Sequence, residues 1–109
     1  MTLISIPDFA GDNKAHSILD LLRDAGMVIP APPTAKALIF REISGGATSS
    51  RIGDLNVKAT QGIPFSSTDS VLLPSVAVGD GLTGAGWELS KVFIWAANGD
   101  TLSVSFVPF

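Results

Sequence analysis

His16 has the most versatile chemistry of any residue in this chain, and it is the only histidine. A relay of serine, histidine and aspartate needs the imidazole held between a nucleophile and a carboxylate. His16 instead lies in a segment whose spacing predicts a short helix, outside the part that predicts strands, so we expect no relay. One histidine and no cysteine also exclude a histidine cluster, thiolate metal sites and a cysteine nucleophile.

The carboxylates give no clearer catalytic pattern. A glycosidase needs two carboxylates facing each other across a cleft, and Glu42 and Glu88 are the only glutamates among ten acidic residues that form pairs by chance. Asp69, Asp80 and Asp100 lie in turn-forming sequences, where aspartate caps its own backbone. Their spacing is not that of an EF-hand calcium loop. We therefore predict no catalytic residue, no cofactor, no metal and no enzyme activity.

A glycine-rich segment and the tryptophan after it form the remaining candidate site. Four of the eight residues 79–86 are glycine, but the segment lacks the Gly-Lys-Ser/Thr ending of a phosphate-binding loop. Trp87 could stack on a sugar ring, with Asp80 of the preceding loop beside it. Trp87 and Asp80 are therefore a possible ligand edge, whereas Trp95 is assigned to the core.

The elements that hold these residues change character near residue 35. Asp12 is a predicted helix N-cap and Gly26 a predicted helix end. The apolar residues between them recur at spacings of three and four: Ala15, Ile18, Leu19, Leu22 and Ala25. Three prolines at 30–33 then favour an extended connector. We divide the chain into an N-terminal arm, residues 1–35, and a body, residues 36–109.

After the connector, the apolar residues alternate with a period of two, which indicates strands. Four segments bounded by turn residues show this pattern: 37–43, 52–59, 63–65 and 70–73. In 52–59 we expect Leu55 and Val57 on the buried face, and Val76 and Val78 suggest another strand. No helical pattern interrupts the series. We therefore predict an all-β fold, an antiparallel β-sandwich or small jelly-roll with one short N-terminal helix.

An Asn-Gly pair at 98–99 joins two alternating runs and forms the strongest hairpin signal in the sequence. Pairing across a two-residue turn places Trp95 opposite Leu102 and Phe93 opposite Val104 on a core face. The other face combines small hydroxyl side chains with aliphatic ones: Val92, Ile94, Ser103 and Ser105. That mixture is too apolar for free solvent and too polar for a core, so we predict a protein contact there.

Charged residues make up 16% of the chain and the net charge is −3, with a pI near 4.7. The seven basic residues are scattered singly, so we expect no nucleic-acid partner. The mean hydropathy of +0.41 is high, yet no apolar run approaches the roughly 18 residues of a membrane span, and the start lacks the features of a signal peptide. We expect a chain that is made in a cytoplasm, has no membrane partner and hides much of its surface against other chains.

The segments 51–57, 62–65, 70–74 and 89–97 follow one another as strands and turns. Over residues 51–109 this series resembles the β-sandwich virion proteins of tailed bacteriophages, which include capsid decoration, or cement, proteins and modules of tails and fibres. The resemblance implies many identical copies, often trimeric, that sit on a shell and hold neighbouring capsid subunits together. It implies no catalytic motif.

The sequence therefore predicts a non-enzymatic capsid decoration protein on the virion surface. Its expected partners are the major capsid protein and copies of itself in a homotrimer. We expect contact residues on the hairpin and on the N-terminal helix: Ile18, Leu19, Leu22, Val92, Ile94, Ser103 and Ser105. Ile94→Asp should then abolish assembly and leave the fold intact. The alternative is a receptor- or glycan-binding module of a phage tail or fibre, with Trp87 and Asp80 at the binding edge.

Overall fold

The computed structural model of the chain describes residues 3–31, 33–44, 50–65, 70–73 and 87–108. These residues form two antiparallel sheets and one short helix. The predicted all-β class with a short N-terminal helix is confirmed, and the finer sandwich or jelly-roll assignment stays a prediction. Within these ranges, no helix has the length and apolar character needed to cross a membrane.

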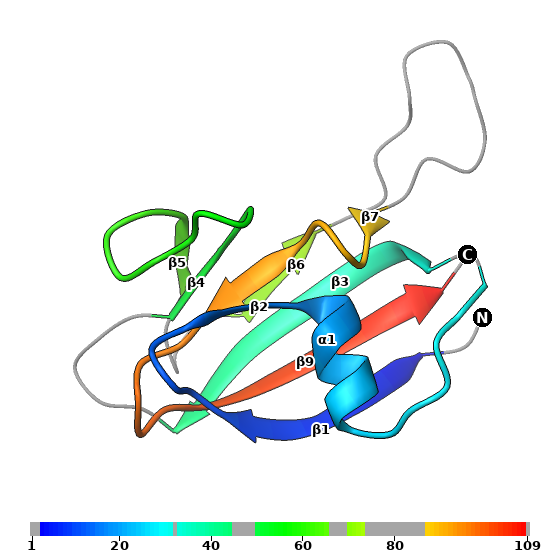
Figure 1. Ribbon diagram of the computed structural model, residues 1–109, viewed down its shortest axis with the longest axis horizontal. Coiled ribbons are helices and arrows are strands. Elements are labelled where there is room, and N and C mark those ends of the chain that lie inside the picture. The colour runs from blue at the N-terminus through cyan, green and yellow to red at the C-terminus, as the bar shows by residue number, and fades with distance from the viewer. Residues whose placement is uncertain (1–2, 32, 45–49, 66–69, 74–86, 109) are drawn as a thin grey trace, which may run out of the picture.

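The larger sheet, which we call the long sheet, is built around β3 (Thr34–Ser44). Its strand order is β1 (Ile4–Ala10), β9 (Thr101–Pro108), β3 and β6 (Ser70–Leu73), and β7 (Trp87–Glu88) pairs with the start of β3. Figure 1 shows β9 lying between β1 and β3. Alternation along β9 separates a core face from an outward one, and three of its side chains are fully buried: Leu102, Val104 and Phe106.

The smaller sheet, which we call the short sheet, has the order β2 (Ala15–Ser17), β8 (Phe93–Trp95), β4 (Ser50–Gly53) and β5 (Ile63–Phe65). In Figure 1 it lies with α1 (Ile18–Asp24) over one face of the long sheet. Both sheets and the helix contribute to one hydrophobic core. Its large, fully buried members include Ile18, Leu22, Leu38, Phe40, Ile94, Leu102, Val104 and Phe106.

The N-cap of α1 is Ser17, whereas the sequence predicted Asp12. The first two helical N–H groups donate to the main-chain carbonyls of Val92 and Leu89, at 3.0 Å each, and the N–H of Asp20 donates to Ser17 Oγ at 3.1 Å. These bonds satisfy three of the four N–H groups that a helix start leaves without an intrahelical partner. The position of the helix start therefore depends on the segment before β8, which is distant in sequence.

Asp12 instead organises a turn before β2. Its Oδ1 accepts the N–H of Lys14 at 3.1 Å, and its Oδ2 lies 2.8 Å from His16 Nε2. Asn13 has a φ of 63°, a left-handed conformation that cannot continue a helix. The single predicted helix is therefore a short strand, β2, followed by a helix of seven residues.

The predicted end of the helix at Gly26 is confirmed. Gly26 has a φ of 69°, which favours glycine. Its N–H donates to the carbonyl of Arg23, and the N–H of Met27 donates to the carbonyl of Leu22, at 3.0 Å each. This pair of bonds is a Schellman motif, which fixes the direction in which the chain leaves the helix.

The predicted terminal hairpin is wrong, although its turn is present. The N–H of Asp100 donates to the carbonyl of Ala97 at 3.1 Å. Gly99 has a φ of 99°, whereas the φ of Asn98 is not positive. A positive φ at the second central residue alone is typical of a type II turn, which splays strands, while a type I′ hairpin turn needs it at both. β8 and β9 therefore enter different sheets, and the predicted pairs between them do not form.

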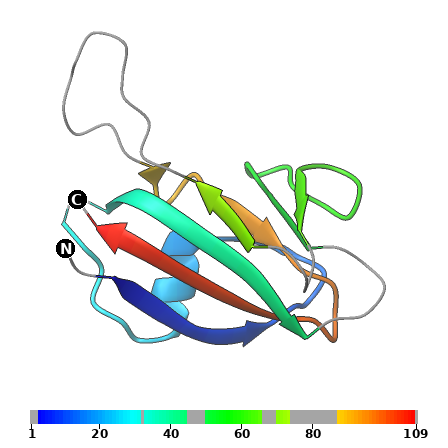
Figure 2. The same ribbon diagram turned by 180° about the vertical axis from the view of Figure 1, so that it is seen from behind.

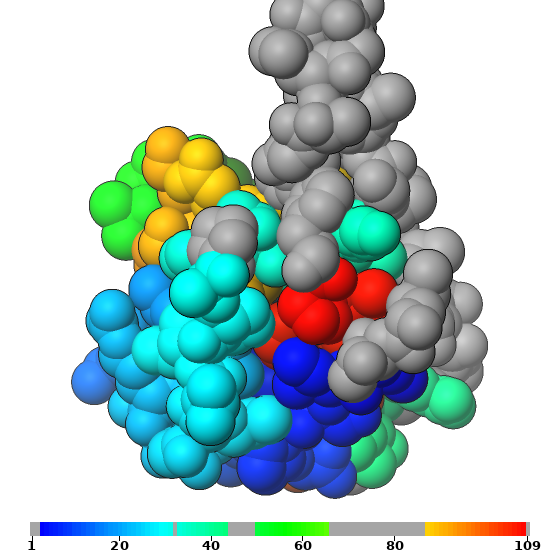
Figure 3. Space-filling model, turned by 90° about the vertical axis from the view of Figure 1, so that its right-hand side faces the viewer, coloured from blue at the N-terminus to red at the C-terminus, as the bar shows by residue number. Residues whose placement is uncertain are grey.

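The first 35 residues do not form a separate arm. β1 is an edge strand of the long sheet and β2 an edge strand of the short sheet, and α1 contributes to the common core. The boundary predicted near residue 35 therefore separates no structural unit. Figure 3 shows the end of the molecule where β1 begins and β9 ends, with the connector after α1, in cyan, forming part of that surface.

The predicted strand 52–59 ends early, at Gly53. Asp54 accepts two backbone N–H groups, that of Asn56 on its carboxylate at 2.8 Å and that of Val57 on its carbonyl at 3.0 Å, so the chain turns there. Leu55, which was expected on the buried face, is 70% exposed, while Val57 is buried.

The other strand predictions fall into two groups. The strands predicted at 37–43, 63–65 and 70–73 are confirmed within β3, β5 and β6. Val76 and Val78 lie outside the described residues.

Candidate functional site

The long sheet has one face that none of the described helices or strands covers. This is the side turned away from the short sheet and α1 (Figure 2). The register aligns Ser5, Ser105 and Ile39 in one row across β1, β9 and β3, and Ser103 with Arg41 in another. We call this surface the outer face and define it by eight residues: Ser5, Ala37, Ile39, Arg41, Ile43, Ser103, Ser105 and Val107.

The outer face mixes aliphatic and hydroxyl side chains and contains one charged residue, Arg41. Ile39 is 37% exposed and Ile43 49% exposed. Ser105 Oγ donates a hydrogen bond to Ser5 Oγ at 3.2 Å, which ties β9 to β1 on this side. A surface with small side chains, aliphatic groups and little charge is easily desolvated, which suits contact with another protein.

The structure brings together only part of the interface predicted from the sequence. Ser103 and Ser105 are half-buried members of the outer face. Their predicted neighbours Val92 and Ile94 are instead in the core, because β8 belongs to the short sheet and Ile94 is 1% exposed. The predicted exposure of these two residues is therefore wrong.

The helix residues of the predicted interface are also covered by the chain itself. Ile18 and Leu22 are fully buried, and Leu19 is partly buried against the same core. The amphipathic side of α1 packs on its own fold and does not present these residues to a partner.

Sequence reasoning missed Ile39 and Ile43 as surface residues. The alternation across 37–43 contained the signal, since it places Ile39 and Arg41 on the face opposite Leu38 and Phe40. What local alternation cannot supply is which face of a strand the rest of the chain covers.

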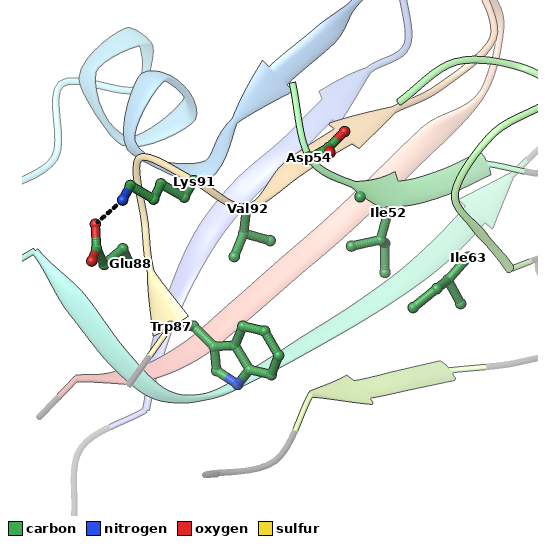
Figure 4. A pocket seen from close by; sticks show the side chains of 8 residues that line it. Ile52, Asp54, Ile63, Trp87, Glu88, Lys91 and Val92 are labelled. Carbon is green, nitrogen blue, oxygen red and sulfur yellow. Dashed lines mark ion pairs between the residues drawn. The ribbon is translucent and has the colours of Figure 1, made fainter. Parts of the chain in front are cut away.

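A hollow of about 420 Å³ lies between the two sheets, beside β7 (Figure 4). Ile52, Ile63, Trp87 and Val92 form its apolar lining. The other lining residues are Gly53, Asp54, Glu88 and Lys91. We call this feature the Trp87 hollow.

One side of the Trp87 hollow carries an ion pair. Lys91 Nζ lies 3.5 Å from Glu88 Oε2, and both side chains are more than half exposed. Such exposed pairs are readily rearranged and contribute little to stability. The apolar side chains, and not the ion pair, therefore determine the polarity of the hollow.

The two residues of the predicted ligand edge have different outcomes. Trp87 is half-buried and forms a wall of the hollow, with its indole ring pointing into it (Figure 4). Asp80 lies outside the described residues. Trp87 is therefore the part of that prediction that can be placed in the fold.

A second hollow, of about 320 Å³, lies between β1 and α1. Its lining contains Asp8, Asp12, Asp24 and His16. His16 is held by Asp12 as an exposed pair. In the part of the chain that the structure describes, no group of three or more histidine, cysteine or acidic side chains is placed to hold a metal ion.

No protein-family model, curated protein or solved structure matches this chain.

Proposed function

We propose that this chain is a non-enzymatic virion structural protein, a capsid decoration protein that stabilises a phage head by bridging capsid subunits. The observation that supports this proposal is the outer face, a sheet surface of low charge that none of the described helices or strands covers, in a chain whose charged fraction is 16%. Ser103 and Ser105, which the sequence assigned to a contact, lie on it. The proposed partners are the major capsid protein, through the outer face, and further copies of this chain.

The size of the outer face favours binding in many copies. The eight residues of β9 and the three strands that carry the outer face, β1, β9 and β3, give a footprint of roughly 26 by 14 Å, or about 370 Å². A specific interface of standard size buries about 800 Å² on each partner. A single outer face therefore binds weakly, and linked copies gain strength because the second contact becomes intramolecular.

A substitution on the outer face tests the proposal directly. Ile43→Asp places a carboxylate in the proposed contact. It should weaken binding by at least about tenfold when the variant is added to phage heads that lack this protein. Co-sedimentation with the heads measures the binding. Leu55→Asp is the matched control, because Leu55 is also an exposed aliphatic residue but lies outside the outer face. Equal binding by both variants and the wild type would exclude this surface as the contact.

A receptor- or glycan-binding role in a tail or fibre is the second candidate, and Trp87 is the observation that favours it. The indole ring lines a hollow, where it could stack on a sugar. Sugar hydroxyls also need polar partners, and two of the polar side chains there, Glu88 and Lys91, already bind each other. Glycan-array binding that is lost in Trp87→Ala would favour this role.

A further inference from the structure

We infer that Asn98 is a site of spontaneous chemical modification, at which the side-chain amide is lost and the main chain rearranges to isoaspartate. The reaction consumes water and needs no enzyme. The chain contains three asparagines, Asn13, Asn56 and Asn98, and the structure distinguishes Asn98 from the other two. The modification site is independent of the proposed function.

The reaction is an attack of a backbone nitrogen on the side chain that precedes it. The Gly99 nitrogen forms a bond to Asn98 Cγ while the bond from Cγ to Nδ2 breaks. Nδ2 leaves as ammonia, which carries away the proton of the Gly99 N–H, and a cyclic imide remains. Water then opens the imide at one of its two carbonyls. Opening at one carbonyl gives aspartate, and opening at the other gives isoaspartate, in which the main chain runs through Cβ and Cγ.

The structure leaves both reacting groups at Asn98 free. Asn98 and Gly99 are exposed. Among the described residues, neither the Asn98 side chain nor the Gly99 N–H has a hydrogen-bond partner. No atom outside the adjacent residues lies within 4 Å of the position that a Cβ of Gly99 would occupy. The Asn98 amide can therefore approach the Gly99 nitrogen without a clash.

Asn13 is protected by hydrogen bonds on both reacting groups. The N–H of the next residue, Lys14, donates to Asp12 Oδ1 at 3.1 Å. Asn13 Oδ1 accepts the N–H of Asn98 at 2.9 Å, which holds the side-chain amide in place. Modification of Asn13 therefore requires that both hydrogen bonds break first.

Asn56 is protected by the turn in which it lies. The N–H of Val57 donates to the carbonyl of Asp54 at 3.0 Å. Val57 is also buried, and its β-branched side chain obstructs the approach to its nitrogen. Asn98 is therefore the asparagine at which the fold leaves the reaction open.

Isoaspartate at position 98 lengthens the main chain where hydrogen bonds hold it in place. The N–H of Asp100 donates to the carbonyl of Ala97 at 3.1 Å across the turn. The carbonyl of Asp100, which is 2% exposed, accepts the N–H of Gly11 at 2.8 Å. This bond joins the connection between β8 and β9 to the connection between β1 and β2, at one end of the molecule (Figure 1). The longer main chain displaces these groups, so the modification should destabilise the fold.

The test is residue-resolved mass spectrometry of the full chain after storage, in native buffer and in urea. In the native chain, Asn98 should convert at least about tenfold faster than the other two asparagines, because the glycine after it has no Cβ to obstruct the attack. Its native rate should lie within about tenfold of its rate in urea, because an exposed turn opens at little cost. A native rate below that range, or the same native rate at all three asparagines, would overturn the inference.

The melting temperature tests the effect of the longer main chain. The isoaspartate form, separated by chromatography, should melt at least about 4 °C below the fresh wild type. Fresh Asn98→Asp is the matched control, because it carries the charge of the product on an unaltered main chain. It should melt with the wild type, since the Asn98 side chain is exposed. Asn98→Ser has no amide to lose and should not change on storage. An isoaspartate form that melts with Asn98→Asp would contradict the effect inferred for the turn.

Discussion

Glu42 and Ser50 form a buried hydrogen bond between the two sheets. Ser50 Oγ, on β4, donates to Glu42 Oε1, on β3, at 3.0 Å, and both residues are almost completely buried. A buried carboxylate is costly unless hydrogen bonds compensate for its lost hydration. This contact therefore helps to fix how the short sheet sits against the long sheet.

Ser50→Ala should lower the free energy of unfolding by about 1–3 kcal/mol, because it leaves the buried Glu42 carboxylate with one partner fewer. Urea denaturation measures the change. Ser5→Ala is the matched control, since it removes a hydrogen bond of 3.2 Å between exposed hydroxyls and should change stability by less than about 0.5 kcal/mol. Equal effects of the two substitutions would show that burial does not set the energy of the Ser50 contact.

Gly11 is required by close packing. A Cβ added there would overlap the carbonyl oxygen of Ala97, and the Gly11 N–H donates to the carbonyl of Asp100 at 2.8 Å. Gly11→Ala should therefore cost more than about 2 kcal/mol. Gly26→Ala should cost about 1–2 kcal/mol, because its φ is 69° but the space around it is open. Thermal unfolding that ranks Gly26→Ala as the more damaging change would contradict this account of Gly11.

Among the elements, β8 shows that the burial of a strand determines how strongly a substitution in it lowers the stability of the fold. Ile94→Asp should lower the free energy of unfolding by more than about 4 kcal/mol and abolish the folded state, because Ile94 is 1% exposed within the core. This reverses the expectation from the sequence that the variant stays folded. Ile63→Asp, on the edge strand β5, should remain folded by circular dichroism. A folded, stable Ile94→Asp variant would contradict the burial of β8.

Local signals in the sequence predicted where elements end better than which elements pair. The helix end at Gly26 and the turn at 98–99 follow from backbone preferences of glycine and were predictable. The helix start was not, because Ser17 becomes the N-cap through hydrogen bonds to Val92 and Leu89 that only the folded chain brings close. The partner strands of β8 are likewise far away in the sequence.

The candidate site was partly predictable for the same reason. Alternation along β9 correctly placed Ser103 and Ser105 opposite the core face. It failed for Val92 and Ile94, because a turn that splays its strands sends β8 into the other sheet, and both residues are buried in the core. The Trp87 hollow combines residues from β4, β5, β7 and the segment before β8, and no single stretch of sequence contains its pattern.

At the scale of the whole molecule, the outer face and the Trp87 hollow lie on different surfaces. The outer face lies on the side of the long sheet away from α1 and the short sheet (Figure 2), whereas the hollow lies between the two sheets. The two features therefore do not compete for one surface. The proposed contact through the outer face is small, so the proposed function requires that many copies act together.

The most direct test of this account is quantitative mass spectrometry of purified phage particles from the source that encodes this chain. The measurement counts this chain against the major capsid protein in the same particles. A decoration protein that bridges capsid subunits should be present in a copy number comparable to that of the major capsid protein. Complete absence from the particles would contradict the virion role, and only a few copies per particle would contradict a role on the capsid shell.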